Sequence, residues 1–202
     1  MSKHRKYAIW TPVAVSTALA TVTLVYYATR DYSTWLTVAK IVIAALIPAL
    51  LPSAEIVFGK KFSVGLNVLI ASHIVFSVYL GSGFGFYSLI PFWDMFLHGY
   101  FGLVGAAVLF ALFARRLEGV GIIWTSIAVF LSVMGCAAMW EIFEYTTDAV
   151  FGQDAQGVYE AMAVGKNPIA DTMSDIIITA PGALLFLVPA ILVILNKKRK
   201  NR

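Results

Sequence analysis

Six long apolar stretches, separated by short polar segments, make up most of the chain. They cover roughly residues 7–28, 34–51, 62–80, 92–113, 120–145 and 174–195. At 1.5 Å per residue, each is long enough to cross about 30 Å of hydrocarbon. Backbone N–H and C=O groups within lipid can bond only to one another, so each stretch is predicted to be a helix. The pattern therefore predicts an all-α polytopic membrane protein, a bundle of six transmembrane helices that forms a single integral membrane domain over residues 1–202.

The composition strengthens this prediction. Hydrophobic residues make up 60% of the chain and charged residues only 13%, with a mean hydropathy of +0.82. A soluble domain has about half apolar and a quarter charged residues, so soluble enzymes, disordered chains and coiled coils are excluded. The single cysteine, Cys136, lies in an apolar stretch, which excludes an intrachain disulfide and a metal site built on thiolates. The first stretch exceeds the length of a cleavable signal segment, so we expect it to be retained.

Basic residues are divided unequally between the two predicted sides of the membrane. Twelve of them fall on the side of both termini: Lys3, Arg5, Lys6, Lys60, Lys61, Arg115, Arg116, Lys197, Lys198, Arg199, Lys200 and Arg202. The other side has Arg30, Lys166 and Lys40, which lies just inside the second stretch. Lys and Arg favour the cytoplasmic side, so we expect a multi-pass protein of a prokaryotic cell (inner) membrane with both termini cytoplasmic. The 15 basic residues exceed the 11 acidic residues by four, which gives the net charge of +4. Because the basic residues flank apolar stretches, no nucleic-acid partner is expected.

Acidic residues show the opposite distribution. Only Glu55 and Glu118 fall on the predicted cytoplasmic side. The nine on the outer side are Asp31, Asp94, Glu141, Glu144, Asp148, Asp154, Glu160, Asp171 and Asp175. This asymmetry is the most informative feature of the sequence, because it concentrates chemistry on one face of the membrane.

Three predicted helices bring acids to the same depth at that face. On each helix the polar residues are three or four positions apart, which places them on one side of the helix. They are Asp94 and His98 on the fourth helix, Glu141, Glu144 and Asp148 at the end of the fifth, and Asp171 and Asp175 at the entry to the sixth. His73, in the outer half of the third helix, is a candidate to point to the same place.

Carboxylates crowded at this depth repel one another, and a bound cation or bound protons would relieve the repulsion. Oxygen ligands favour Mg²⁺, Mn²⁺ or Ca²⁺, and a histidine nitrogen admits Zn²⁺ or iron. We therefore expect His98, Glu141, Glu144, Asp171 and Asp175 as candidate ligands of a divalent metal ion. Glu144 or Asp94 is the candidate general base. His73, Asp148 and Lys40 are expected in a supporting or alternative role.

Each of these residues also has a simpler explanation. Asp94, Asp171 and Asp175 are placed to interact with helix dipoles. His73 alone is more typical of a hydrogen-bonded core residue, and Lys40 of a side chain that snorkels to the interface. The dipole does not explain Glu141, Glu144 and Asp148, because they lie at a helix C-terminus, where it opposes a negative charge.

Three stretches resemble the YjdF-like family of uncharacterised bacterial inner-membrane proteins and, more distantly, VanZ-like proteins. They are Trp93-Asp94-Met95-Phe96-Leu97-His98-Gly99, Trp140-Glu141-Ile142-Phe143-Glu144, and Asp171-Thr172-Met173-Ser174-Asp175 followed by Gly182-Ala183. The resemblance covers roughly the second half of the chain. It implies an inner-membrane location and supports the site, but it implies no reaction.

Three functions remain open at this point. The first is a divalent-metal-dependent enzyme, or a binder of lipid phosphate headgroups, at the outer leaflet. The second is a cation- or proton-coupled transporter or channel that uses the acidic cluster as its vestibule. The third is a non-catalytic membrane scaffold whose acids cap helices and solvate loops. The expected partners are membrane lipid and a small ion or lipid phosphate.

Overall fold

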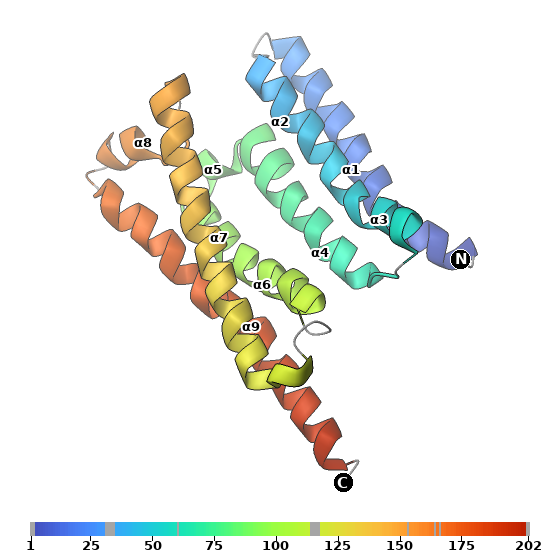
Figure 1. Cartoon of the computed structure of the whole chain (residues 1–202). Coiled ribbons are helices and arrows are strands. Elements are labelled where there is room, and N and C mark those ends of the chain that lie inside the picture. Colours follow the sequence, from blue (N-terminus) through green and yellow to red (C-terminus); the bar gives the residue numbers. More distant parts are fainter. Residues whose placement is uncertain are drawn as a thin grey trace. The chain divides into compact units, whose positions relative to one another are not determined.

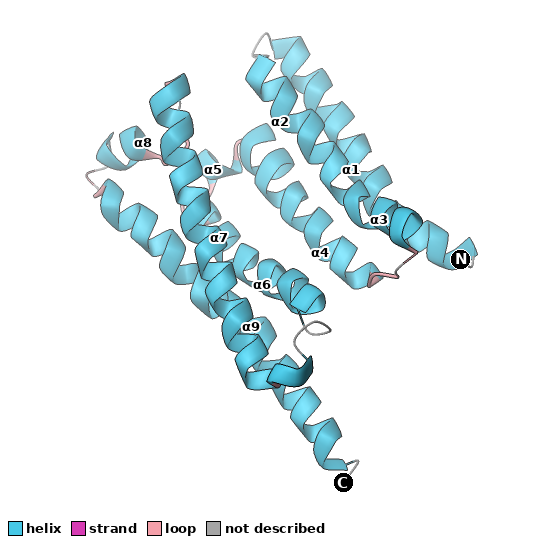
Figure 2. Ribbon diagram, viewed as in Figure 1, coloured by secondary structure: helices cyan, strands magenta, loops and turns pink. Residues whose placement is uncertain are grey.

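The computed structural model describes residues 3–30, 35–59, 61–113, 118–152, 154–163, 165 and 167–200. All regular elements in these ranges are helical (Figure 2). Six helices are long and apolar enough to cross a membrane, which confirms the predicted all-α class. The chain forms two compact units, unit 1 over Met1–Trp93 and unit 2 over Asp94–Arg202. Six charged residues of the orientation argument lie outside the described residues: Asp31, Lys60, Arg115, Arg116, Lys166 and Arg202.

Unit 1 contains three of the candidate spans (Figure 1). Its elements are α1 (Lys3–Arg30), α2 (Trp35–Leu46), the 3₁₀-helix η1 (Ile47–Ala49), α3 (Leu50–Phe58), α4 (Val64–Ile74), the π-helix η2 (Val75–Gly83) and α5 (Phe86–Leu89). The second span runs over Thr37–Val57, longer than the predicted 34–51, because α2, η1 and α3 follow one another without a break. Pro48 lies in η1, and since proline has no N–H to donate, the helix changes its hydrogen-bond pattern there.

Polar contacts hold α1 against the neighbouring helices of unit 1. The hydroxyl groups of Ser16 and Tyr79 are 3.0 Å apart and both residues are fully buried. A Cβ at Gly83 would lie 2.9 Å from Thr23 Cγ2, so the glycine lets η2 approach α1. At the start of α1, Arg5 pairs with Glu55, whose Oε1 also accepts the Phe62 N–H at 2.6 Å. The beginning of α1 and the end of α3 therefore lie at the same end of unit 1, as the predicted topology requires.

Unit 2 contains the other three spans. Its elements are α6 (Trp93–Phe113), which begins one residue before the unit, the short η3 (Glu118–Val120), α7 (Ile122–Phe151), α8 (Val158–Ala163) and α9 (Pro168–Lys200). Helices α7 and α9 pack side by side (Figure 1). Both extend beyond the predicted spans 120–145 and 174–195, so Asp148 lies within α7 and Asp171 within the first turn of α9.

Glycine allows α6 and α9 to pack with their backbones in contact. A Cβ at Gly182 would collide with the carbonyl oxygen of Gly99, and a Cβ at Gly102 with that of Thr179. Small residues at such positions allow two helices to approach closely. Deeper in the unit, a fully apolar core joins α6, α7 and α9 through buried Ala106, Val129, Val133, Ala183 and Leu187.

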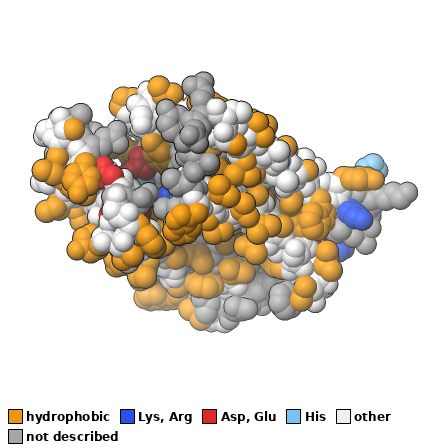
Figure 3. Space-filling model, turned by 90° about the horizontal axis from the view of Figure 1, so that it is seen from above, with side chains coloured by type: hydrophobic (Ala, Val, Ile, Leu, Met, Phe, Trp, Pro, Cys, Tyr) orange, Lys and Arg blue, Asp and Glu red, His pale blue; other side chains and the backbone are white. Residues whose placement is uncertain are grey.

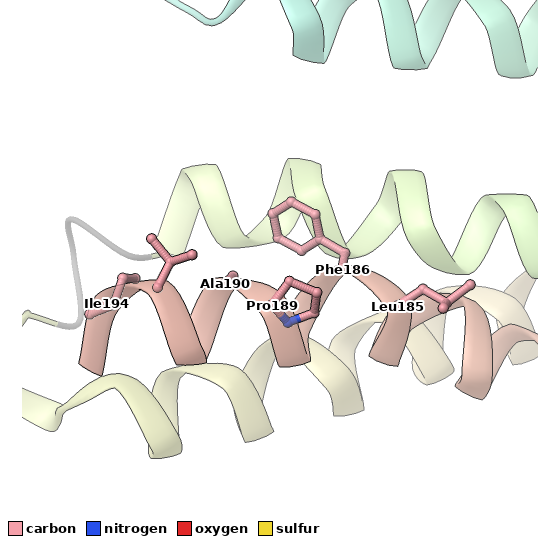
Figure 4. Close-up of a pocket in the computed structure, with 6 residues that line it drawn as sticks. Leu185, Phe186, Pro189, Ala190 and Ile194 are labelled. Atoms are coloured by element: carbon pink, nitrogen blue, oxygen red, sulfur yellow. The ribbon is translucent and has the colours of Figure 1, made fainter. Parts of the chain in front are cut away.

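An apolar groove runs along one side of α9 (Figure 4). It is lined by Leu185, Phe186, Pro189, Ala190, Val193 and Ile194. Leu185 is ten residues from Asp175, or about 15 Å along a helix. The groove therefore lies apart from Asp171 and Asp175 at the start of α9, and no polar side chain lines it.

The contact between α6 and α9 gives a test of the packing. We expect Gly182→Ala to lower the thermal stability of the detergent-solubilised protein by about 1–3 kcal/mol, because backbone atoms of Gly99 cannot move aside as a side chain could. Gly135→Ala is the matched control, since no atom lies within 4 Å of its Cβ position. Equal melting temperatures for the two variants would contradict the packing.

Candidate functional site

The candidate site lies where α6 begins, α7 ends and α9 begins, which we call the acidic end of unit 2. Asp94 is in the first turn of α6, Glu141 and Glu144 are near the end of α7, and Asp175 is in the second turn of α9. The view onto the end of the molecule in Figure 3 shows acidic side chains grouped among hydrophobic ones. Unit 2 thus brings residues from all three predicted helices together.

His98 lies at the centre of this group. Its Nε2 atom is 3.7 Å from Asp94 Oδ1, one turn earlier on α6, and 3.8 Å from Glu141 Oε1 on α7. The His98 side chain is 9% exposed and that of Asp94 is 51% exposed. The imidazole is therefore enclosed, whereas Asp94 leaves the group open on one side.

Asp94, His98 and Asp175 together have the geometry of a metal-binding group. Each offers one ligand atom, and the three atoms all lie within 4.8 Å of one another. Ligand bonds of about 2.0–2.6 Å place neighbouring ligand atoms roughly 3–4 Å apart, so small side-chain rotations would close the group around an ion. Asp175 is buried, and it interacts electrostatically with Asp94, Glu141 and Asp171.

Glu141, on α7, is the enclosed carboxylate next to His98. The residue is 5% exposed, and its Oε1 atom is fully buried without a hydrogen-bond partner among the described residues. The same carboxylate interacts with the side chains of Thr172 and Gln156, which hold it in place. A buried charge that is left uncompensated is costly, and a metal ion next to His98 Nε2 would remove that cost.

Glu144 lies at the edge of the group. Its Oε1 accepts a 2.8 Å hydrogen bond from Trp140 Nε1, one turn earlier on α7. The residue is half-buried, while Trp140 is 50% exposed. Glu144 also interacts electrostatically with Glu141, Asp94 and Asp175. Its carboxylate is close enough to be repelled by theirs, but it is not part of the Asp94–His98–Asp175 group.

Asp148 organises the loop that follows α7. Its two carboxylate oxygens accept the backbone N–H groups of Ala155 and Gln156 at 2.6 and 3.0 Å. This fold-back places Gln156 Nε2 at 3.5 Å from both the Glu141 carbonyl oxygen and Thr172 Oγ1. Gln156 and Thr172 were not among the predicted site residues. Thr172 directly follows Asp171 in the sequence, but nothing in the sequence marks a loop residue such as Gln156.

The remaining predicted residues occupy other positions. Asp171 is half-buried in the first turn of α9, where its Oδ2 atom lies 3.8 Å from a Cβ built on Gly157, outside the Asp94–His98–Asp175 group. His73 is in α4 and Lys40, with an exposed side chain, is in α2. Both belong to unit 1, whereas the site lies in unit 2, so their supporting roles at the acidic end of unit 2 stay predictions.

Comparison with known proteins supplies the family. A family model described as "Predicted membrane protein (DUF2238)" matches residues 11–197. The chain belongs to this family. No curated protein and no solved structure matches the chain. The family match covers every residue of the candidate site, and its description names a membrane protein without an activity.

The loop contacts of Asp148 lead to a stability prediction. We expect Asp148→Asn to weaken both backbone hydrogen bonds and to cost roughly 1–3 kcal/mol locally, because bonds to a charged acceptor are the stronger kind. Hydrogen exchange at residues 154–157 should accelerate, as measured by mass spectrometry. Thr146→Ala is the control, since Thr146 only bonds the carbonyl of Ile142 in its own helix. Unchanged exchange in Asp148→Asn would show that the carboxylate does not hold the loop.

Proposed function

We propose that the acidic end of unit 2 binds one divalent metal ion through Asp94, His98, Glu141 and Asp175, and that this ion holds the phosphate of a membrane lipid headgroup. The observation that carries the proposal is the buried, unpartnered Oε1 of Glu141 beside His98 Nε2. The other two carboxylates approach the same imidazole from α6 and α9. Together they offer an incomplete shell of negative and neutral ligands for a cation.

The ligand types narrow the choice of ion. Three carboxylates and one imidazole nitrogen suit Mn²⁺ or Zn²⁺, and such a site also accepts iron. Ca²⁺ and Mg²⁺ prefer ligand shells made only of oxygen, so His98 counts against them. Mn²⁺ is the ion that we favour, because carboxylates outnumber the single nitrogen.

A phosphate ligand follows from the open side of the group. Asp94 is half-exposed, so an ion held here would keep a coordination position accessible from outside the helices. Lipid phosphates lie at this depth of a membrane, and phosphate oxygens bind hard divalent ions well. A bound ion could equally activate water for hydrolysis, with Glu144 or Asp94 as general base, and this catalytic form of the proposal stays a prediction.

The orientation is part of the proposal. Twelve Lys and Arg residues on the side of both termini against three on the other support cytoplasmic termini in a prokaryotic inner membrane, with the acidic end of unit 2 outside. The YjdF-like resemblance supports the same location, since all three stretches that carry it lie within the matched residues 11–197. The more distant resemblance to VanZ-like proteins adds no role to the proposal.

A cation pathway through unit 2 finds less support. Eight residues below His98, Glu141 and Asp175, about 12 Å along each helix, lie Ala106, Val133 and Ala183. All three belong to one buried apolar core with Val129 and Leu187. This layer closes the three helices directly beneath the site. A one-sided binding site therefore fits the described residues of unit 2 better than a channel does.

Metal binding predicts that one substitution lowers the affinity for Mn²⁺ and raises the stability of the metal-free protein. We expect Glu141→Gln to weaken Mn²⁺ binding at least tenfold, because a neutral amide replaces a ligand charge, and to stabilise the metal-free protein, because the uncompensated buried charge is gone. In the unmutated protein, Mn²⁺ at a hundred times its Kd should add about 2.7 kcal/mol of stability. Metal analysis and thermal unfolding with and without Mn²⁺ measure both effects.

Two further variants complete that experiment. Asp175→Asn should behave like Glu141→Gln, whereas the loop variant Asp154→Asn should keep the affinity of the unmutated protein, since Asp154 is outside the Asp94–His98–Asp175 group. No stoichiometric ion in the unmutated protein after incubation with Mn²⁺, Zn²⁺ and Fe²⁺ would refute the metal site. That result would favour the scaffold function.

The predicted orientation is tested separately with reporter fusions. Green fluorescent protein joined after Arg202 should fluoresce, and alkaline phosphatase joined there should be inactive, because both ends of the chain are expected in the cytoplasm. Alkaline phosphatase joined after Gly165 of a truncated chain should be active. The reverse pattern would place the acidic end of unit 2 in the cytoplasm.

A further inference from the structure

An aromatic and acidic patch lies on the exposed side of α7, on the same turns as Glu141. Trp140 and Phe143 are 50% and 55% exposed, and their ring centroids are 5.4 Å apart. Between these rings and the buried group lies Glu144, which accepts the hydrogen bond from Trp140 Nε1. We call Trp140, Phe143 and Glu144 the α7 patch.

The angular spacing of residues around α7 places this patch beside the proposed metal ligands. At about 100° per residue, Glu144 lies roughly 60° from buried Glu141 and roughly 40° from exposed Trp140. The Cβ atoms of Glu141 and Glu144, three residues apart, are separated by about 5–6 Å. Glu144 therefore lies between the enclosed ligands and the exposed side of α7.

The charge of the patch has no basic neighbour on the described parts of α7, α8 and α9 before Lys197. Between Glu118 and Lys197 the sequence contains one basic residue, Lys166, which is outside the described residues. Among the described residues no ion pair involves Glu144. Glu144 lies next to the exposed ring of Trp140, which in turn lies next to Phe143. A carboxylate beside an exposed aromatic ring is a recognised environment for an ammonium group, which gains both ion pairing and cation–π attraction.

We propose that the α7 patch binds the ammonium group of a phosphoethanolamine headgroup whose phosphate is held by the metal ion. This inference rests on the proposed function and names its ligand class. Only two carbons and one oxygen separate the phosphorus from the nitrogen in this headgroup, and the two proposed contact points are likewise about one helix turn apart. A glycerol headgroup carries the phosphate without the ammonium, so it would use the ion alone.

A role of the aromatic rings in the membrane interface alone is the competing explanation. Tryptophan is common at membrane interfaces and needs no particular headgroup there. The two explanations differ in one respect: an interfacial role gives no preference between headgroups, whereas the α7 patch distinguishes ethanolamine from glycerol. The test is therefore a ratio of affinities rather than a single affinity.

The experiment uses the full chain in nanodiscs, with phosphatidylethanolamine and phosphatidylglycerol of identical acyl chains competing for retention. Native mass spectrometry measures the ratio of the two lipids bound, with and without Mn²⁺. We expect a preference of about fivefold to tenfold for phosphatidylethanolamine that requires Mn²⁺. Soluble glycerophosphoethanolamine is added in a separate arm. If it displaces the lipid, the headgroup alone is sufficient; if it does not, the acyl chains are also required, and both results fit the proposal.

Two variants test the patch. Glu144→Gln and Trp140→Leu should bring the ratio close to one while the Mn²⁺ content, measured in the same samples at saturating Mn²⁺, stays stoichiometric, because only the ammonium contact is removed. Trp124→Leu is the matched control, since Trp124 is also an exposed tryptophan, in the first turn of α7 at the opposite end of the same helix. Should Trp140→Leu fail to fold, the nearly isosteric Glu144→Gln still decides.

The outcomes separate this inference from the proposed function. Stoichiometric Mn²⁺ with equal binding of the two lipids would overturn the ammonium site and leave the metal site standing. A preference that persists in Glu144→Gln would overturn it as well. Absence of Mn²⁺ binding, together with a ratio near one, would overturn both proposals at once.

Discussion

Unit 2 depends on one electrostatic constraint: carboxylates buried at the end of membrane-spanning helices require a positive partner. Glu141 and Asp175 are both buried, and His98 is the only described imidazole among them. Ionisable groups at this depth are costly and persist where they are paired or where they serve a function. Gln156 donates to the backbone carbonyl oxygen of Glu141, and the uncharged side chains of Gln156 and Thr172 interact with its carboxylate without neutralising it. A bound cation, as proposed above, or bound protons would complete the arrangement.

The packing of the helices sets the positions of these carboxylates. Gly99 and Gly182 let the backbones of α6 and α9 touch, and Thr179 Oγ1 donates to the carbonyl oxygen of His98 at 3.3 Å in the same contact zone. Thr179 is one turn from Asp175, so the contact that joins the helices also fixes the distance between His98 and Asp175. Beneath it, the apolar core locks α7 against both helices.

The sequence predicted the six spans because lipid responds to length and polarity, which are local properties. It also predicted that Asp94 and His98 meet, since a spacing of four residues places them on one stripe of α6. It did not predict which of Glu141 and Glu144 points into the group. Both residues lie on the same side of α7, and their spacing does not fix the rotation of the helix about its axis. That rotation is set by contacts such as Val133 in the core. The role of Asp148 depends on a reversal of the chain at Gly152, which spacing along a helix does not show.

The two sides of α7 explain why a membrane surface, rather than an aqueous channel, is the environment that suits this site. One helix turn presents Glu141 to the enclosed group and Trp140 to the exposed side, with Glu144 between them. The layer of Ala106, Val133 and Ala183 closes the route further into the helices, while Asp94 leaves the end open. A ligand that reaches the ion must therefore come from the membrane surface or along the exposed side of α7. In the proposed orientation both approaches lie among lipid headgroups, so a lipid would reach the proposed ion without first leaving the membrane.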